Sequence, residues 1–489
     1  MARMSVIAYR VLPLIAAAAA GCAALQGGLG DGDRAREAEV SSFRPVRPER
    51  WKLPNGLTVL YLKDDELPLV TGKLFVRGGA LWADGAPNGS TSAMGDQMRQ
   101  GGAGGRSADE LDRELEKLSA AVVSTMATEF GAVSFAALSS DVDKVFPIFA
   151  DVALRPRFEE QRLSLWKGQS IESIRRRKED PGTVASIAFQ QLVYGDSPYG
   201  RVAVERDIAA VSRAHLVRLH EKLVRPDGAI LAISGKIDRA HAEALVSRHF
   251  GAWRARGALL PPAPPDNYQP KPGVYFITLP FSQATVKMGQ LGIPRLTPDY
   301  PQIDLFNEVF GASGFGSRLM ARVRTELGLT YGIYGMISPA VVKGTNYVFL
   351  QTKAESVSPA ITESLAVLKG LQAAPPTALE LGEKKAAIRN SYVFNFDSPA
   401  DIVSRDASLE LLNYPADYDQ TYLEKIDAVA PEQVTEVARS RWDPSQFVIV
   451  VVGSEAAFEG LAKSMQDKGG PLGAFGLKKL SFETAIVGQ

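Results

Sequence analysis

The sequence predicts an α+β protein made of two homologous domains, each a sandwich of one sheet and its helices. Three observations support this prediction: an internal repeat, short strands rich in β-branched residues among amphipathic helices, and a proline-rich segment between the two copies. The chain has 489 residues, of which 45% are hydrophobic, so it can build roughly two to four domains with large cores.

The repeat is clearest near the end of each copy, where a helix, a proline turn and an apolar strand ending in glycine follow one another. The spacings between these markers are the same in both copies, and a dipeptide ending in proline matches further upstream at the same offset. Such agreement across two halves indicates duplication of one domain. The matching pairs are Ile208–Val211 with Ile426–Val429, Pro226 with Pro444, Gly235 with Gly453, and Asp180-Pro181 with Ser398-Pro399.

Each copy is predicted to contain two or three strands, then helices, a strand pair, further helices, and a buried strand with a closing helix. Val133 and Phe135 alternate with smaller residues, which is typical of a half-buried strand. Ser107 and Glu110 form a capping box that predicts the start of a helix carrying Leu111. The predicted strands are Leu57–Leu62, Thr71–Arg77, Ala132–Leu138, Ala229–Ser234, Val274–Thr278, Ala284–Leu291, Thr330–Ile337, Thr345–Lys353 and Phe447–Val452.

The first residues are predicted to be a targeting signal. Two arginines precede the apolar run Val11–Ala20, which is too short to span a bilayer as a mature helix. Small residues then lead to Cys22, the only cysteine of the chain, and this arrangement resembles a bacterial lipoprotein signal with Cys22 as the lipidated residue. The alternative is an ordinary secretory signal with an incidental cysteine. A single cysteine also excludes an intramolecular disulfide and a cysteine-based metal site.

These features divide the chain into a signal peptide, a tether, two domains and a linker. The residues after Cys22 lack an aspartate that would favour retention in the inner membrane, so the resemblance implies an outer-membrane lipoprotein that faces the periplasm. With 55 basic and 55 acidic residues, the chain has no net charge that would favour nucleic acid as a partner. The predicted segments are signal 1–22, flexible tether 23–46, first domain 47–255, proline-rich linker 256–270 and second domain 271–489.

A helix early in the first domain resembles the zinc-binding helix of the M16 (pitrilysin/insulinase) metallopeptidases. It reads Ser-Ala-Met-Gly-Asp-Gln-Met from Ser92, and it follows the strand entry Leu-Pro-Asn-Gly-Leu at Leu53. Members of that family carry His-x-x-Glu-His in this helix, whereas this chain has Ala93, Asp96 and Gln97 at the matching positions.

The substitutions remove the chemistry that zinc requires. A catalytic zinc needs three protein ligands and an open position for water, but alanine cannot bind a metal and the amide of Gln97 is a poor ligand. The third ligand in the family is a glutamate on a later helix, where this chain has Ser173, with Glu172 pointing about 100° away around the helix. We therefore predict no metal in this chain and interpret Ala93, Asp96, Gln97 and Ser173 as a degenerate zinc motif.

The second domain keeps another signature of the same family. A glycine-rich loop from Gly311 leads into a predicted helix, Arg318–Glu326, which turns at Gly328 into a strand. This resembles the M16 motif in which an arginine and a tyrosine face the zinc from the opposite domain, here Arg324 and Tyr331. A guanidinium can donate hydrogen bonds to a peptide carbonyl, and a phenol can stabilise an oxyanion. The alternative is that Arg324 pairs with a nearby acid such as Glu326 and that Tyr331 belongs to the core.

The resemblance extends from about Arg47 to Gly453 and implies two metallohydrolase-like domains that face each other across a cavity. Many family members are heterodimers in which one subunit holds zinc and the other supplies the arginine and tyrosine. By resemblance this chain is the second kind: inactive alone, partnered by a zinc-bearing M16 homologue, acting on peptides or unfolded polypeptides, and attached to the membrane by lipid. Two alternatives remain open: a peptide-binding or scaffold protein of the cell envelope, and an enzyme with an unrecognised site.

Overall fold

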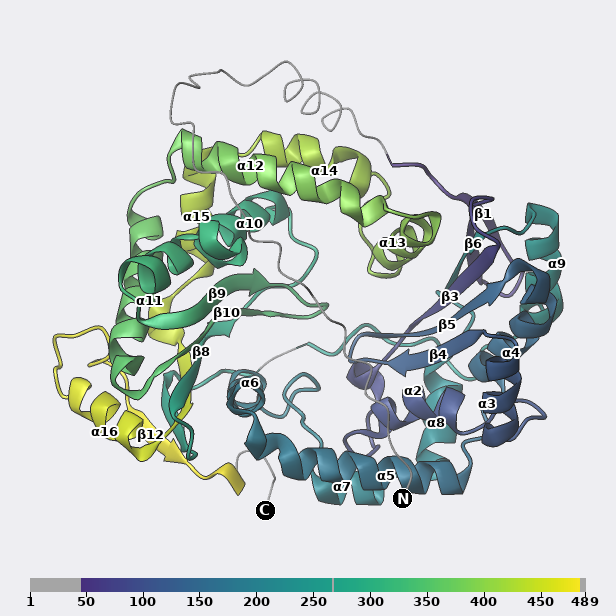
Figure 1. The fold of residues 1–489 in the computed structure, drawn as a ribbon, viewed down its shortest axis with the longest axis horizontal. Coiled ribbons are helices and arrows are strands. Elements are labelled where there is room, and N and C mark those ends of the chain that lie inside the picture. The colour runs from purple at the N-terminus through teal and green to yellow at the C-terminus, as the bar shows by residue number, and fades with distance from the viewer. Residues whose placement is uncertain (1–44, 266–267, 484–489) are drawn as a thin grey trace, which may run out of the picture. The chain divides into compact units, whose positions relative to one another are not determined.

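Two six-stranded sheets form the framework of the protein, one from each half of the chain (Figure 1). The computed structural model describes residues 45–265 and 268–483. The predicted signal peptide, Cys22 and nearly all of the predicted tether therefore lie outside the described residues. Within the described part of the chain, no helix has both the length and the apolar character needed to cross a membrane.

The first sheet has the strand order β1-β2-β6-β3-β5-β4. Its central strand β6 is buried along its whole length, because it lies parallel to β2 on one side and antiparallel to β3 on the other. The outer strand β4 pairs only with β5, so its other side is a free edge. The strands are β1 (Glu49–Lys52), β2 (Thr58–Lys63), β3 (Leu69–Arg77), β4 (Ala121–Met126), β5 (Phe130–Leu138) and β6 (Ile230–Gly235).

The second sheet repeats this topology in the order β12-β7-β11-β8-β10-β9. The central β11 is again fully buried between a parallel and an antiparallel neighbour, and β9 is the free edge equivalent to β4. The two sheets differ only in the strand at the edge opposite β4 and β9. In the first sheet this strand is β1, which is antiparallel to β2, and in the second sheet it is β12, which is parallel to β7. The strands are β7 (Gly273–Thr278), β8 (Gln283–Leu291), β9 (Thr330–Ser338), β10 (Thr345–Lys353), β11 (Val448–Gly453) and β12 (Leu477–Leu480). The prediction of two homologous α+β halves is confirmed.

Helices cover both sheets and connect their strands (Figure 1). In the first half they are α2 (Ser90–Gln100), α3 (Ala108–Lys117), α4 (Val142–Leu154), α5 (Glu160–Arg175), α6 (Pro181–Tyr194), α7 (Glu205–Ala210), α8 (Arg213–Leu223) and α9 (Arg239–Phe250). In the second half they are α10 (Tyr300–Asn307), α11 (Val357–Ala373), α12 (Ala378–Tyr392), α13 (Pro399–Leu411), α14 (Tyr418–Asp427), α15 (Pro431–Arg441) and α16 (Glu455–Ser464), with π-helices η4 (Glu308–Ala312) and η6 (Met320–Glu326). The predicted capping box opens α3 as expected.

Each half contributes one helix to the sheet of the other half. Helix α6 packs on β8 and β11, where Phe189 and Val193 lie in one cluster with Val450. Helix α13 packs on β2, β3 and β6, where Ala407 and Ile230 belong to one hydrophobic cluster. The two sheets are therefore joined by a reciprocal exchange of helices, and part of each hydrophobic core belongs to both halves.

The repeated dipeptides seen in the sequence mark the starts of these exchanged helices. The Asp180 carboxylate accepts a hydrogen bond from the backbone nitrogen of Gly182 at 2.9 Å, with Pro181 as the first helical residue. The Ser398 hydroxyl accepts a hydrogen bond from the backbone nitrogen of Asp401 at 3.2 Å, again with proline following. Both are N-caps of the usual kind, with proline in the position where its missing N–H has no cost.

Candidate functional site

The helix with the degenerate zinc motif, α2, is held tightly against the edge strand β4. A Cβ at Gly95 would lie 2.3 Å from the backbone nitrogen of Met126, so only glycine allows this approach. The Ser124 hydroxyl of β4 donates a hydrogen bond to the Gly95 carbonyl at 2.6 Å. Met94 and Met98 are buried in the core below the helix. Gly95, Ser124 and the two buried methionines therefore hold α2 firmly in the first half.

The side chains at the three motif positions on α2 are either buried or bonded to another part of the protein. Ala93 is fully buried, and Gln97 is 1% exposed. The two polar atoms of the Gln97 amide have no hydrogen-bond partner within the described residues. The Asp96 carboxylate accepts a hydrogen bond from the Trp166 Nε1 at 2.8 Å, which ties α2 to α5. Asp96 is thus an anchor between two helices.

The fourth motif position, Ser173, is exposed on α5, as is its neighbour Glu172. Both line an open hollow of about 980 Å³ with Arg176 and Asp180. Among the residues that the structure describes, no three His, Cys, Asp or Glu side chains come together in a way that could hold a metal. An alanine, a buried amide and a hydroxyl do not make a zinc site, so the residues present do not fit the metal that the family resemblance implies.

Arg324 and Tyr331 lie side by side in the second half. The guanidinium carbon of Arg324 is 5.3 Å from the ring centre of Tyr331 and 4.4 Å from that of Phe315. Tyr331 is 82% exposed and Phe315 is 70% exposed, so the cation is held between two accessible rings. Glu326 pairs with Arg322 at 2.9 Å. The alternative in which Arg324 pairs with Glu326 and Tyr331 lies in the core is therefore wrong.

The backbone around this cluster explains the arrangement. The predicted helix forms, but its larger part is the π-helix η6, which carries Arg324. Gly328 has a φ of 60°, ends this helix and turns the chain into the edge strand β9, at whose start Tyr331 lies. π-Helical turns in proteins are frequent at functional sites because they change the direction in which side chains point.

The glycine-rich loop before η6 is anchored by a side chain from another helix. The Lys384 ammonium of α12 donates hydrogen bonds to the Ser313 hydroxyl at 2.8 Å and to the Gly316 carbonyl at 2.6 Å. Gly311 is needed for close packing, since a Cβ there would lie 2.4 Å from the backbone nitrogen of Gly335. The anchored loop presents Phe315. Sequence reasoning missed this residue, although a phenylalanine between two glycines was the available signal.

The two free edge strands are connected at the tips of their hairpins. Glu129, in the turn between β4 and β5, accepts a hydrogen bond from the backbone nitrogen of Val341 at 2.7 Å, in the turn between β9 and β10. Its other oxygen accepts one from the Arg295 guanidinium at 2.8 Å. The Tyr199 hydroxyl donates a third at 2.9 Å, and burial together with the Glu129 charge raises the pKa of Tyr199. Glu129 therefore fixes the two edges relative to each other.

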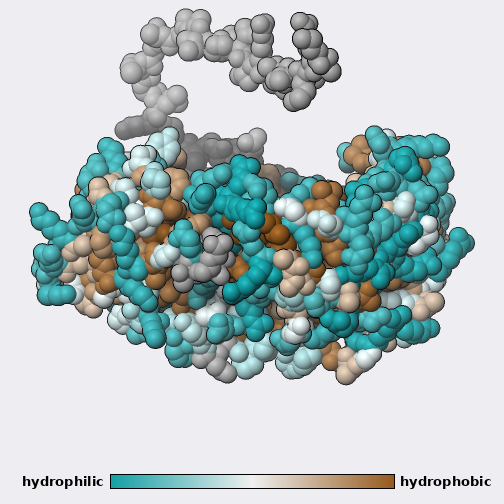
Figure 2. All heavy atoms as spheres, turned by 90° about the horizontal axis from the view of Figure 1, so that it is seen from below, coloured by the Kyte–Doolittle hydropathy of each residue, from teal (hydrophilic) through white to brown (hydrophobic). Residues whose placement is uncertain are grey.

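Each of the two edge strands pairs with one neighbouring strand, and on β9 the Asn307 side chain already bonds the Ile337 backbone nitrogen at 2.8 Å and its carbonyl at 3.0 Å. On β4, Ala121, Val123 and Thr125 are exposed, and on β9 the exposed residues are Tyr331 and Tyr334. On the face shown in Figure 2, hydrophilic residues predominate and hydrophobic residues form patches between them. An open edge strand with accessible aromatic side chains is a typical surface for strand addition by a peptide.

Known proteins resemble both halves of this chain. The family model for insulinase (peptidase family M16) matches residues 58–220, and the model for the peptidase M16 inactive domain matches residues 210–388. An uncharacterized zinc protease of Mycobacterium tuberculosis is 24% identical over 339 residues, covering 68% of this chain and 77% of that protein.

Solved structures agree with the sequence matches. A peptidase M16 inactive domain from Pseudomonas fluorescens is 27% identical, with a TM-score of 0.76 over 84% of this chain and 98% of that chain. A protease from Helicobacter pylori has a TM-score of 0.72 over 84% of this chain and 100% of that chain. It is 15% identical, so this second likeness concerns the fold alone.

Proposed function

The chain belongs to peptidase family M16, and we propose that it is a non-catalytic subunit that binds extended peptides for a zinc-bearing homologue. The observation that carries the proposal is the pairing of two features in one chain. The Arg324, Tyr331 and Phe315 cluster is accessible at a free edge strand, whereas the helix that holds zinc in the family has no ligand. A substrate-holding surface without a metal site is suited to a supporting subunit.

In this proposal the peptide lies as an added strand along the first part of β9, near Tyr331, because Asn307 already bonds the Ile337 backbone further along the strand. Backbone hydrogen bonds to a sheet edge bind an extended chain with little dependence on its sequence. The Arg324 guanidinium donates hydrogen bonds to a carbonyl of the peptide, and the Tyr331 hydroxyl donates a hydrogen bond near the same carbonyl. The rings of Phe315 and Tyr331 hold the guanidinium in place, which reduces the entropy lost on binding. Hydrolysis itself belongs to the partner subunit.

Two similarities support a partnership of this kind. The Pseudomonas fluorescens structure, which aligns with nearly the whole described chain, is itself named an inactive M16 domain. The relatives found by sequence are named zinc proteases, which is the type of protein that would supply the metal and the general base. We propose a heterodimer of one subunit of each type.

The test is turnover of a quenched fluorogenic peptide by this chain assembled with a zinc-bearing M16 homologue from the same organism. Arg324→Ala and Tyr331→Ala should each lower kcat/KM by about tenfold or more, which corresponds to about 1.4 kcal/mol. Arg322→Ala is the matched control, since Arg322 lies on the same helix and pairs with Glu326 and Glu363. Equal turnover by all three variants, with assembly intact, would remove the cross-subunit role.

A second candidate function is peptide binding without any peptidase partner. It is favoured by the free edge of β9, which needs no second subunit in order to pair with an extended chain. Calorimetric titration of an extended peptide into the chain alone distinguishes the two functions. Tight binding by the single chain, combined with no effect on a coexpressed zinc homologue, would favour the scaffold role.

We also propose that Cys22 carries a lipid and that the protein is attached to the outer membrane, facing the periplasm. The support is the sequence around Cys22, the only cysteine of the chain. Labelling of cells with radioactive palmitate should mark the parent protein and leave Cys22→Ala unlabelled. Label that persists in the variant would contradict the assignment.

A further inference from the structure

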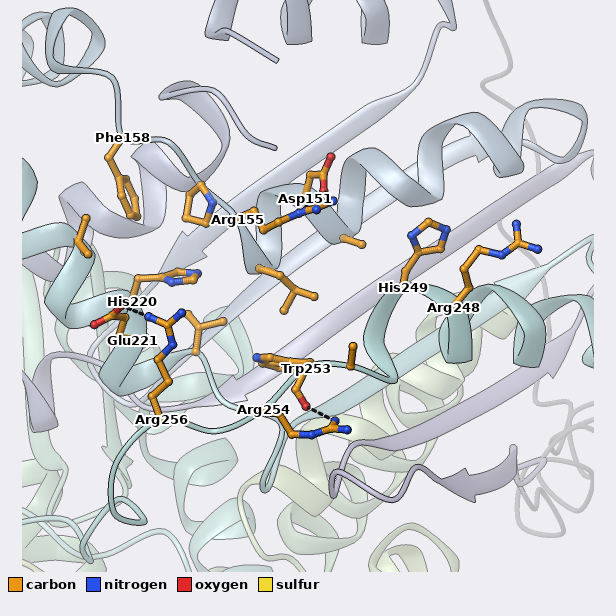
Figure 3. Close-up of a pocket in the computed structure, with 16 residues that line it drawn as sticks. Asp151, Arg155, Phe158, His220, Glu221, Arg248, His249, Trp253, Arg254 and Arg256 are labelled. Atoms are coloured by element: carbon orange, nitrogen blue, oxygen red, sulfur yellow. Dashed lines mark hydrogen bonds and ion pairs between the residues drawn. The ribbon is translucent and has the colours of Figure 1, made fainter. Parts of the chain in front are cut away.

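The first half contains a hollow of about 630 Å³ between α4, α8 and α9, and the arginines that line it lie apart (Figure 3). Arg248 and Arg254 lie on different sides of the hollow and point away from each other. The other two arginines each pair with a carboxylate that also lines the hollow. These charges therefore do not gather at one place where a ligand could bind them.

A different cavity, of about 670 Å³, lies where the two halves and the linker meet, and we name it the junction cavity. Its volume is within the range of roughly 300 to 1,000 Å³ that is typical of pockets for small molecules. The first half contributes the end of β3 and the start of β5, the second half contributes the end of α13 and the turn between β9 and β10, and the linker contributes residues 260–263. None of its lining residues belongs to the Arg324 cluster or to the degenerate zinc motif. The junction cavity is therefore separate from the proposed peptide site.

The walls of the junction cavity are mostly apolar. Trp82 is buried, and its Nε1 donates a hydrogen bond to the Pro261 carbonyl at 2.9 Å, which fixes the linker against the first half. Leu411, at the end of α13, is also buried and closes the wall on the side of the second half. Further apolar lining comes from Phe130, Leu296, Val341 and Val342. Such walls favour an apolar molecule over a small hydrated ion.

Arg77 is a cation of this lining that has no acidic partner among the described residues. Its Nη2 donates hydrogen bonds to the Leu411 carbonyl at 2.8 Å and to the Asn413 Oδ1 at 2.9 Å, and both of these residues also line the cavity. The guanidinium therefore lies at the cavity wall, and its Nε and Nη1 have no partner in the described part of the chain. The other charged residues of the lining, Glu129 and Arg295, pair with each other at 2.8 Å. The lining thus carries one uncompensated positive charge, which one acidic group of a ligand can match.

We propose that the junction cavity binds an apolar small molecule with a single acidic group, namely a carboxylate or sulfonate on a hydrocarbon body. The Arg77 guanidinium donates hydrogen bonds to the acidic group, and the apolar walls cover the body of the ligand. Because both halves and the linker contribute to the walls, a bound ligand also restrains the two halves relative to each other. The site is independent of peptide binding at Arg324 and Tyr331.

The test uses two fluorescent probes that share the same rings and differ in one acidic group. The first is 1-anilinonaphthalene-8-sulfonate, and the second is N-phenyl-1-naphthylamine, which lacks the sulfonate. Each is titrated into the full chain carrying Cys22→Ser, so that no attached lipid takes up the probe. Arg77→Gln should raise the Kd of the sulfonate by about tenfold and leave the Kd of the uncharged probe within about twofold of the parent value. Arg50→Gln is the matched control, because Arg50 also joins the two halves, through Glu410, but does not line the cavity.

A second variant locates the bound probes. Ala263→Trp places a large ring in the cavity from the side of the linker, so both probes should lose their saturable binding. Saturable binding that survives in Ala263→Trp, or an unchanged Kd of the sulfonate in Arg77→Gln, would overturn the proposal. An equal loss of affinity for both probes in Arg77→Gln would also overturn it, because Arg77 would then support the shape of the cavity without binding the acidic group.

Discussion

The side chain of Gln97 is poorly matched to its buried surroundings. It is 1% exposed, and neither polar atom of its amide has a partner within the described residues. A buried polar group without a hydrogen bond costs about 1 to 3 kcal/mol. By the resemblance described above, Gln97 stands at the position of a metal ligand in the M16 family.

Replacing Gln97 with methionine should therefore stabilise the protein. The two side chains have similar length and volume, and the variant removes the unpaired amide, so we expect a gain of about 1 kcal/mol in the free energy of unfolding. Urea unfolding followed by circular dichroism measures it. Gln100→Met on the exposed end of the same helix is the control and should change little. A loss of stability in Gln97→Met would indicate that the amide has a polar partner, such as a bound water.

Asp304 on α10 should make the stability of the protein depend on pH. Its carboxylate accepts a hydrogen bond from the Tyr422 hydroxyl at 2.9 Å. Burial raises the pKa of Asp304 to about 6 from its ordinary value of 3.8, the Tyr422 hydrogen bond opposes the rise, and the charge of Glu308 adds to it. The folded chain keeps a proton that the unfolded chain has released between about pH 4 and pH 6. Stability from this group therefore falls as the pH rises through that window.

Asp304→Asn should remove this loss. Between pH 4 and pH 7 the free energy of unfolding of the variant should rise by roughly 2 to 3 kcal/mol relative to that of the parent, because the neutral amide does not titrate. Urea midpoints over this pH range provide the measurement. Asp84→Asn, at an exposed turn, should follow the parent curve. If the urea midpoints of Asp304→Asn followed the same pH dependence as those of the parent, Asp304 would not be the group that causes the loss of stability.

At the scale of the element, the exchanged helices α6 and α13 make the two halves depend on each other. Each helix starts at a cap in its own half and packs on the sheet of the other half. Removing the N-cap of one of these helices should therefore destabilise the sheet of the other half. This consequence would not follow if each half had a closed core.

We expect Asp180→Ala and Ser398→Ala each to cost about 1 kcal/mol, the usual effect of losing an N-cap. Hydrogen exchange should show where the loss acts. Asp180→Ala should speed exchange in β11 of the second sheet, and Ser398→Ala should speed it in β6 of the first. Ser107→Ala removes the cap of α3, which stays within its own half, so its effect should remain there. Exchange changes confined to the mutated half would contradict the coupling.

Much of the sheet structure could be predicted from the sequence, and the exceptions have a physical explanation. Apolar runs such as those of β6 and β11 predicted central strands, and all nine predicted strands are present. The missed strands are edges: β1 and β12 are short and charged, and β4 consists largely of small residues. The exchange of α6 and α13 could not be predicted, because an apolar helix face shows that it is buried but not which sheet buries it.

The candidate site was predicted only in part for a related reason. Arg324 and Tyr331 stand in a motif that local sequence carries, and the structure brings them together. Phe315 lies in the glycine-rich loop, but its contact with Arg324 is seen only in the structure, and Lys384, which anchors that loop, comes from the distant helix α12. The structural role of Asp96 likewise depends on Trp166, which lies on another helix. A local sequence motif does not show which side chains from other helices or strands contact it in the folded protein.

For the whole molecule, Glu129 is the polar counterpart of the exchanged helices. It is largely buried and receives hydrogen bonds from both halves, including that of Arg295. Removing one partner of a buried ion pair leaves the other charge without compensation, which costs more than the pair itself contributes. The tips of the two edge hairpins meet at Glu129, so the loss should also change the distance between the edges on which a peptide would bind.

A double-mutant cycle tests this connection. Glu129→Gln and Arg295→Met should each cost about 2 kcal/mol in the free energy of unfolding, and the double variant should cost clearly less than their sum, with a coupling of about 1.5 kcal/mol. The Arg50–Glu410 pair also joins the two halves, but it is exposed, so the same cycle there should give a coupling below about 1 kcal/mol. Small-angle scattering should show a larger radius of gyration for Glu129→Gln alone. Additive effects at Glu129 and Arg295, with unchanged scattering, would show that the exchanged helices hold the halves together without this contact.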